Sequence, residues 1–431
     1  FVREIILASN FGISTQADIA VLLLTLPDLL VGILLSGGLS VALIPALQRL
    51  PKSDASLLFL QVSIGIIFLF GSLATVLALK PQIWLSILAP GILPSVIDKQ
   101  SSVFALITWA IPLSALAGVT TAYHHANNQF FVAGLGTLIF NISVIISLLI
   151  TRQISHPVLA LSVGIIIGAL LRWVSQLLTL PKYLWQLSRI KLLINFEFIK
   201  SFIAAAMATS LLLFAPVVIR AMASSISDGQ IAAFNYATKL VELPVGVLIT
   251  TIGTVLYPRL SELHIKGKKQ QLQEEIRQGI QKSIILSIAV LLPGIWFMDS
   301  VVNVIFVRGK LDLVAAQHIV NLTKIALLGI PLIAVGRLAM TVLNASNRTG
   351  IVLRLTSLNL ILLSIIAWFG VTYKSPIWLM FSLVIFQSFQ ALMLSKAAQI
   401  PWLGNMGWIT KQLIFKVVMM IAGMLCVVAI D

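Results

Sequence analysis

Long apolar runs alternate with short polar connections along almost the whole chain. A helix that crosses a bilayer needs about 20 consecutive apolar residues, and runs of that kind predict roughly thirteen membrane spans, of which the first is partial. The predicted spans cover residues 1–10, 17–49, 56–79, 101–123, 129–151, 157–180, 198–222, 229–257, 282–307, 313–343, 350–372, 376–399 and 411–430. The pattern therefore predicts an all-α integral membrane protein with about 13–14 transmembrane helices.

Composition and charge agree with a chain that lies in lipid. It is 59% hydrophobic and 10% charged, with a mean hydropathy of +1.05, which excludes a water-soluble domain of this size. Lys and Arg total 29 against 14 Asp and Glu, for a net charge of +15. If the first span leaves the cytoplasm, the basic connections 49–52, 182–191 and 259–282 all lie on the cytoplasmic side. The charge therefore indicates topology and requires no nucleic-acid partner. Alternating charges within 259–282 predict a short cytoplasmic surface helix.

Two pairs of segments repeat along the chain at a nearly constant spacing. Residues 16–50 and 229–263 share a Leu-Pro within the span and a second Pro followed by Leu near its end. Residues 120–141 and 341–360 each cross a short turn containing Asn into another apolar run. Repeats of this length predict a fold built twice, as two lobes of about six helices. The predicted parts are an N-terminal lobe (1–181), a cytoplasmic linker (182–200), a C-terminal lobe (201–400) and an additional transmembrane helix (401–431).

Charged side chains inside the predicted spans are the first candidates for function, because each costs several kcal/mol in lipid unless it faces a cavity or a partner. The chain places the following in or near spans: Arg3, Glu4, Asp18, Asp28, Arg172, Arg220, Lys239, Glu242, Asp299, Arg337 and Arg354. Arg172, Arg220, Asp299 and Arg354 lie near span ends, where a long side chain reaches the headgroups. Lys239 and Glu242 are one helical turn apart within a span, so they either pair with each other or line a common cavity.

Cationic side chains inside a membrane protein suit a substrate that carries phosphate or pyrophosphate, because Arg offers a bidentate fork and Lys a point charge. The sequence contains no arrangement of a nucleophile with a base, and its five His residues lack the spacing of metal ligands. No phosphate-binding loop of the Walker type occurs, and the single Cys426 excludes a disulfide framework. We therefore expect a protein that is not an enzyme and that has no bound cofactor or metal.

Several segments together resemble the MurJ (MviN) lipid II flippases of the multidrug/oligosaccharidyl-lipid/polysaccharide exporter superfamily. The resemblance covers nearly the whole chain, and the segment DGQIAAFNYATKLVELPVGVLITTIGTVLYPRLSEL carries it most specifically. Other segments that resemble the family are FVREIILASNFGISTQADIAVLLLTLPDLL, SVALIPAL, AYHHANNQF, VIFVRGKLD and LNASNRTGIVLRL. The resemblance implies a V-shaped flippase fold of two six-helix lobes around a cationic cavity, followed by C-terminal helices that form a groove for the polyprenyl tail.

The resemblance also implies a function and a set of site residues. A flippase of this family moves lipid II, the undecaprenyl-pyrophosphate-linked peptidoglycan precursor, from the cytoplasmic to the periplasmic leaflet of the bacterial inner membrane by alternating access. Membrane potential or ions reset the cycle. The implied partners are membrane lipids and the cell-wall synthesis machinery around a monomer, with no nucleic acid. By position in the motifs, the substrate-binding residues are Arg3, Asp18, Lys239, Glu242 and Arg337.

The chain departs from the family pattern after the Leu-Pro-x-Leu-Leu motif. Where the family carries one or two arginines and then a glutamate, this chain has Val31, Gly32 and Ser36, and Lys239 replaces an arginine. Lysine keeps the charge and loses the bidentate geometry. These changes favour, as an alternative, a flippase for another polyprenyl-linked oligosaccharide of capsule, exopolysaccharide or O-antigen. An ion-coupled multidrug exporter and a scaffold without transport are further alternatives, which the net cationic charge and the buried charges disfavour.

Overall fold

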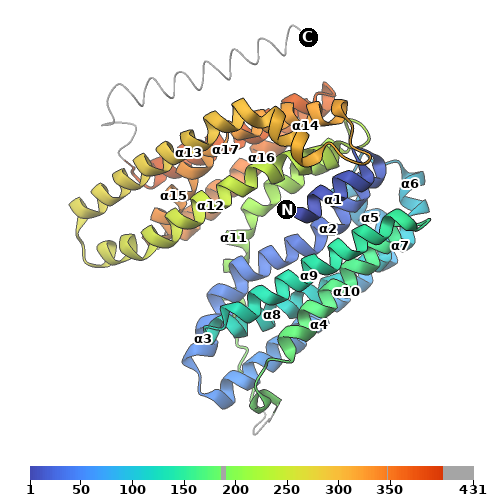
Figure 1. Cartoon of the computed structure of the whole chain (residues 1–431). Coiled ribbons are helices and arrows are strands. Elements are labelled where there is room, and N and C mark those ends of the chain that lie inside the picture. Colours follow the sequence, from blue (N-terminus) through green and yellow to red (C-terminus); the bar gives the residue numbers. More distant parts are fainter. Residues whose placement is uncertain (186–190, 347, 401–431) are drawn as a thin grey trace. The chain divides into compact units, whose positions relative to one another are not determined.

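The computed structural model describes residues 1–185, 191–346 and 348–400, and this part of the chain consists of helices joined by short connections, with one isolated β-bridge between Arg308 and Leu311 (Figure 1). The first helices are α1 (Val2–Phe11), α2 (Thr15–Ile33), the π-helical segment η1 (Leu34–Leu43), α3 (Ile44–Arg49), α4 (Lys52–Leu79), α5 (Pro81–Leu88), α6 (Pro94–Lys99), α7 (Ser101–Ile107), α8 (Ala110–Ala126), α9 (Phe130–Ile150), the 3-10 turn η2 (Thr151–Gln153) and α10 (Pro157–Leu177). They are followed by the 3-10 turn η3 (Lys182–Trp185), α11 (Phe196–Ala223), α12 (Gln230–Ile265), α13 (Lys269–Phe306), α14 (Leu313–Leu327), α15 (Ile330–Ala345), α16 (Thr349–Thr372) and α17 (Pro376–Ala397).

The predicted spans agree with these helices. Each span from 1–10 to 376–399 coincides with one helix or with consecutive helices joined end to end. Eight helices of the described residues are long and apolar enough to cross a membrane, or up to ten if each bent pair is one span. The prediction of an all-α, multi-pass membrane protein is therefore confirmed. The last predicted span, 411–430, and the additional helix assigned to 401–431 lie outside the described residues.

The chain forms two compact units. The first contains Phe1–Glu242, Pro293–Leu327 and Thr356–Phe386. The second contains Leu243–Leu292, Leu328–Leu355 and the described residues from Gln387 on. The first unit thus joins the predicted N-terminal lobe to segments of the predicted C-terminal lobe, and the division into lobes at 182–200 stays a prediction.

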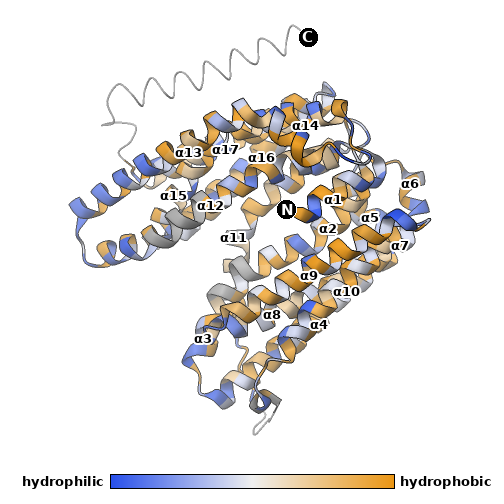
Figure 2. Ribbon diagram, in the orientation of Figure 1, coloured by the Kyte–Doolittle hydropathy of each residue, from blue (hydrophilic) through white to orange (hydrophobic). Residues whose placement is uncertain are grey.

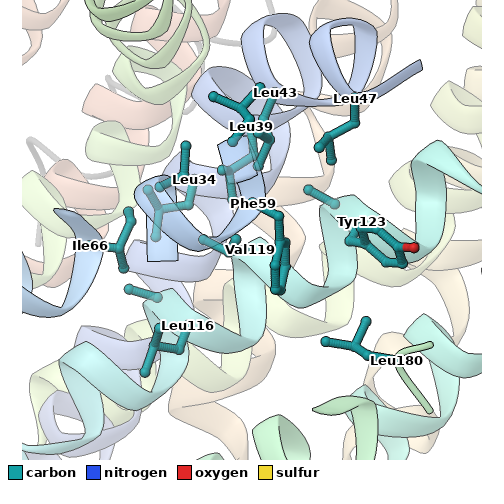
Figure 3. Close-up of a cluster of buried hydrophobic side chains, with 14 of the residues drawn as sticks. Leu34, Leu39, Leu43, Leu47, Phe59, Ile66, Leu116, Val119, Tyr123 and Leu180 are labelled. Carbon is teal, nitrogen blue, oxygen red and sulfur yellow. The ribbon is translucent and has the colours of Figure 1, made fainter. Parts of the chain in front are cut away.

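An apolar cluster packs one end of the first unit (Figure 3). Its buried residues are Leu34, Leu39, Leu43, Leu47, Leu58, Phe59, Val62, Ile66, Ala115, Leu116, Val119, Ala122, Tyr123, Leu180 and Leu184. The Phe59 and Tyr123 rings meet edge to face with centroids 5.4 Å apart, which holds α4 against α8. Leu47 and Leu184 bring the ends of α3 and η3 into this cluster. The two basic connections 49–52 and 182–191, both predicted to be cytoplasmic, therefore begin at the same end of the unit.

Turns meet closely at the other end of the first unit, where α1 ends and α2 begins. The Lys310 amide donates to the Ser9 carbonyl oxygen at 2.9 Å, and the Gly91 amide donates to Ser224 Oγ at 2.9 Å. Gly12 has a φ of 62°, and a Cβ there would lie 2.7 Å from the Lys310 carbonyl oxygen. Only glycine tolerates both conditions. Close backbone contacts thus join the N-terminal helices to segments from beyond residue 224 at this end.

The second unit contains a polar helical hairpin in place of the predicted surface helix. The prediction of a separate helix within 259–282 is wrong, because α12 continues to Ile265 and α13 begins at Lys269 after a turn at Gly267, which has a φ of 65°. Leu260, Ile276 and Ile280 belong to a buried apolar cluster with α15 and α17, and the charged residues point outward. Figure 2 shows the resulting hydrophilic tip. The apolar residues recur at helical spacing and extend both long helices beyond the hydrophobic runs.

Candidate functional site

Arg3 lies at the centre of a buried ion-pair network in the first unit. Its guanidinium donates to Glu4 Oε1 from Nε at 3.1 Å and from Nη2 at 2.9 Å. The same Nη2 donates to Asp28 Oδ2 at 2.9 Å, which links α1 to α2. The side chains of Arg3 and Glu4 are 10% and 4% exposed, whereas that of Asp28 is 45% exposed. One carboxylate of this network is therefore enclosed and the other is accessible.

Glu4 also connects the network to α12. Asn235 Nδ2 donates to Glu4 Oε2 at 2.8 Å, so both carboxylate oxygens of Glu4 accept hydrogen bonds from protein donors. Asn235 is itself buried. A buried carboxylate that is fully hydrogen-bonded holds its partner in one orientation. Glu4 therefore positions Arg3 and joins a helix of the N-terminal half to one of the C-terminal half.

Two further arginines lie inside the first unit, although the sequence predicts that they reach the headgroups. Arg172 on α10 is only 6% exposed, and Arg220 on α11 donates from Nη1 to Thr25 Oγ1 at 3.0 Å. Among the described residues, the Nε atoms of both arginines are buried without a hydrogen-bond partner. The prediction of snorkelling is thus wrong for these two, because their helices pack against α2 and not toward the lipid headgroups.

These side chains form one buried charge cluster, which we define as Arg3, Glu4, Asp28, Arg172 and Arg220. Arg172 and Arg220 lie on α10 and α11, which both pack against α2, the helix of Asp28, and Arg220 bonds to Thr25 one turn before Asp28. Three guanidinium cations face two carboxylates, so the cluster carries a surplus positive charge. A buried charge costs several kcal/mol unless it is paired. Such a cluster in a membrane span is suited to hold an anion.

Lys239 and Glu242 on α12 lie next to this cluster. Lys239 Nζ is 2.6 Å from Glu242 Oε2, and the two side chains are 29% and 48% exposed. The Glu242 carboxylate also attracts Arg220. The sequence predicts that the two residues either pair with each other or line a common cavity, and the structure shows that they pair. Both side chains are partly exposed. Their assignment as substrate-binding residues stays a prediction.

Asp18 has a structural partner at the end of the first unit where the turns meet. Its Oδ2 accepts from the Gly229 amide at 2.7 Å and its Oδ1 accepts from the Ala232 amide at 2.8 Å. These amides belong to the start of α12, where unpaired N–H groups and the helix dipole favour a carboxylate. Asp18 is 2% exposed. The structure thus places it as a cap that joins α2 to α12.

Arg337 belongs to the second unit, unlike the other four predicted site residues. It is an exposed residue of α15 in the second unit, and its guanidinium makes no hydrogen bond or ion pair with the described residues. Arg3, Asp18, Lys239 and Glu242 all belong to the first unit. The structure brings Arg3, Lys239 and Glu242 to one charged region, and Asp18 to the closed end of the same unit.

Asp28, Arg172, Arg220 and Asn235 are residues of this region that the set of predicted site residues does not contain. The sequence shows a signal for the first three, since each is a charge in or near a span. It shows none for Asn235, which is one of many polar residues in α12. His124 bonds to Gln129 and Gln176 as a structural residue, and the described residues contain no group of three or more potential metal ligands.

Comparisons with known proteins identify a family whose model matches almost the whole chain. The family model described as "Lipid II flippase MurJ" matches residues 7–430. The "Probable lipid II flippase MurJ" of Buchnera aphidicola subsp. Acyrthosiphon pisum is 28% identical over 329 residues, 72% of this chain. The "Lipid II flippase MurJ" of Burkholderia cenocepacia is 22% identical over 328 residues, again 72% of this chain. Each match spans 63% of the length of that curated relative.

Solved structures show the same fold. A lipid II flippase MurJ in an inward closed conformation superposes with a TM-score of 0.81 at 18% identity, covering 92% of this chain and 84% of that one. An inward-facing multidrug resistance MATE family transporter of the MOP superfamily gives a TM-score of 0.77 at 13% identity, covering 94% and 95%. At these identities the likeness establishes the fold alone.

Proposed function

Because the chain belongs to the lipid II flippase MurJ family, we propose that it moves lipid II from the cytoplasmic to the periplasmic leaflet of a bacterial inner membrane. The curated relatives carry that activity in their names. The protein then works by alternating access, and its substrate is an undecaprenyl-pyrophosphate-linked glycan. It transports this lipid without making or breaking covalent bonds, so it is not an enzyme.

The buried charge cluster is the observation that carries the proposal. A polyprenyl pyrophosphate is a strong anion that must cross the apolar core of the membrane. Arginine suits such a group, because its planar guanidinium donates two parallel hydrogen bonds to phosphate oxygens. Arg3 is held in place by Glu4, and Lys239 lies nearby on α12 as a point charge. The substrate-binding residues proposed here are Arg3, Lys239 and Glu242, which all belong to the first unit.

Energy for the cycle comes from the membrane in this proposal. The sequence contains no nucleotide-binding loop, so we propose that the membrane potential or an ion gradient resets the empty protein. One elementary charge moved across about 100 mV corresponds to about 2.3 kcal/mol, which is enough to bias a two-state equilibrium strongly. We propose a monomer that acts beside the cell-wall synthesis machinery.

A second candidate is a flippase for another polyprenyl-linked oligosaccharide. The motif after Pro27 has Val31 and Gly32 where the family carries arginine. A Cβ at Gly32 would lie 3.0 Å from Leu213 Cδ1, so α2 and α11 approach closely there. An arginine side chain at Gly32 would require Leu213 to move. This local difference favours a changed headgroup preference, because the charge at that point of α2 is absent.

Complementation tests the proposal. The protein is expressed in bacteria depleted of their own lipid II flippase, its membrane level is checked, and survival is scored. We expect rescue by the unchanged protein and by Arg49→Ala, which alters an exposed arginine at the end of α3. Arg3→Ala and Lys239→Ala are expected to lose rescue at equal membrane levels. Good expression without rescue would contradict lipid II transport and favour the second candidate.

A further inference from the structure

Three arginines come from three different helices that all pack against α2, the helix that carries Asp28. Arg3 of α1 is ion-paired with Asp28 at 2.9 Å. Arg220 of α11 bonds to Thr25, which lies three residues before Asp28 and so on the same face of α2. Arg172 of α10 is buried, with 6% of its surface exposed. Asp28 is thus paired with one arginine, and two further arginines lie on helices packed against its own.

Some N–H groups of these arginines have no hydrogen-bond acceptor among the described residues. A guanidinium carries five N–H donors. Arg220 uses one of them on Thr25, and the buried Nε atoms of Arg172 and Arg220 have no partner among the described residues. A buried donor without a partner destabilises a protein, and a charged donor does so more strongly. The region therefore has donors in place for an acceptor with several oxygens.

The two carboxylates of the cluster differ in how firmly they are held. Glu4 is enclosed and accepts from both Arg3 and Asn235. Asp28 accepts only from Arg3 within the described residues, and its side chain is 45% exposed. A carboxylate with one hydrogen bond and an open side can return to water at small cost, whereas Glu4 cannot. Asp28 is therefore the displaceable anion of the cluster.

We propose that Arg3, Arg172 and Arg220 form one binding site for the phosphate groups of the substrate, and that Asp28 is an internal counter-ion that occupies this site until the substrate displaces it. The site takes a polyprenyl-linked phosphate or pyrophosphate, and this identity rests on the proposed function. When the substrate arrives, Asp28 releases Arg3 and the phosphate oxygens accept from Arg172 and Arg220 as well. When the substrate leaves, Asp28 pairs again with Arg3, so the empty site keeps this cation paired.

This proposal predicts that a variant without the Asp28 carboxylate binds the ligand more tightly than the unchanged protein. Substitution of a residue in a binding site normally lowers the affinity for the ligand, but here the substitution removes a group that competes with the ligand. Asp28→Asn is expected to raise the affinity for undecaprenyl pyrophosphate by about tenfold, because the Asp28 carboxylate no longer competes with the ligand for Arg3. Arg172→Gln and Arg220→Gln are each expected to lower it by about tenfold.

The measurement is native mass spectrometry of the purified protein titrated with undecaprenyl pyrophosphate, with uncharged undecaprenol as the matched lipid. Undecaprenol binding is expected to be the same in every variant, because undecaprenol carries no phosphate for the arginines to bind. Asp98→Asn and Arg49→Gln make the same charge changes at exposed positions and are expected to bind as the unchanged protein does. Arg172→Lys and Arg220→Lys keep the buried charge if the Gln variants do not fold, and are expected to bind less tightly than arginine.

The outcomes separate this inference from the proposed function. If the unchanged protein binds undecaprenyl pyrophosphate and Asp28→Asn binds it equally or more weakly, Asp28 is not a competing counter-ion. Unaltered binding by the Arg172 and Arg220 variants would remove these two residues from the site. If the unchanged protein prefers undecaprenyl pyrophosphate no more than undecaprenol, both the proposed function and this inference are wrong.

Discussion

Glu4 is the residue on which the position of Arg3 depends most directly. Its two oxygens accept from Arg3 and from Asn235, on different helices. Arg3 and Glu4 are adjacent in the sequence, and adjacent residues of a helix do not normally face each other. The pair forms because the long arginine side chain turns back toward a partner that Asn235 has already fixed. Arg3 is therefore a predictable binding residue, whereas the function of Glu4 as its support appears only in the fold.

Glu4→Gln tests this support. We expect a loss of transport together with a fall in stability of about 1–3 kcal/mol, because a buried cation loses one of its two carboxylates and keeps only Asp28. The readouts are survival in the complementation assay and the midpoint of thermal unfolding. Glu262→Gln is the matched control, since its ion pair with Lys266 is exposed and such pairs stabilise a protein little. Equal behaviour of the two variants would contradict a supporting function of Glu4.

At the scale of elements, the start of α12 is held by a residue from α2. Asp18 accepts from two amides of the first turn of α12, more than 200 residues further along the chain. The repeat in the sequence pairs these same two segments, 16–50 with 229–263. The structure adds that the two related helices touch at their N-terminal ends. This cap joins the two halves of the sequence within the first unit.

Asp18→Asn is expected to weaken the cap that Asp18 forms at the start of α12. Asparagine keeps one acceptor and loses the charge, so it can no longer accept from both Gly229 and Ala232. We expect a loss of about 1–2 kcal/mol, the usual range for a helix cap with a charge at the helix N-terminus. Thermal unfolding measures the loss. Asp312→Asn is a suitable comparison, since Asp312 accepts from the Ala315 amide at the start of α14 and caps a helix locally. A larger loss of stability in Asp312→Asn than in Asp18→Asn would contradict the prediction that the Asp18 cap is the more important of the two.

At the scale of the whole molecule, the contacts at the closed end of the first unit predict a sidedness. Gly12, Gly91 and Gly229 all lie at this end and meet neighbouring backbone closely. The basic connections that the positive-inside bias assigns to the cytoplasm begin at the opposite end. In this state the charged region around Glu242 is therefore closed toward the periplasm.

Cysteine labelling checks this sidedness. Cys426 is replaced by serine, and Glu242→Cys is introduced at a side chain that is 48% exposed. A membrane-impermeant maleimide is expected to label it in inside-out vesicles at least several times faster than in right-side-out vesicles, because access follows the open end of a two-state transporter. A cysteine at exposed Asp98 is expected to react faster from the other side. Faster labelling of Glu242→Cys from the periplasm would reverse the assigned state.

The sequence alone determined the features that depend on lipid as a solvent. Apolar runs of sufficient length had to become helices, because only helices satisfy their own backbone hydrogen bonds in a bilayer. The charge of the connections indicated the topology, and the spacing of Lys239 and Glu242 indicated a pair because one helical turn separates them. These inferences need only the period of a helix and the cost of burying charge.

Only the tertiary structure decided which charges meet. Asp28, Arg172 and Arg220 come from three helices, and whether each points to lipid or to the interior depends on the rotation and crossing of those helices. Packing of small and large side chains sets that rotation, through contacts between residues far apart in the sequence. For the same reason Asp18, predicted as a binding residue, became a cap of α12, and a stretch predicted as a surface helix became the tip of a long hairpin.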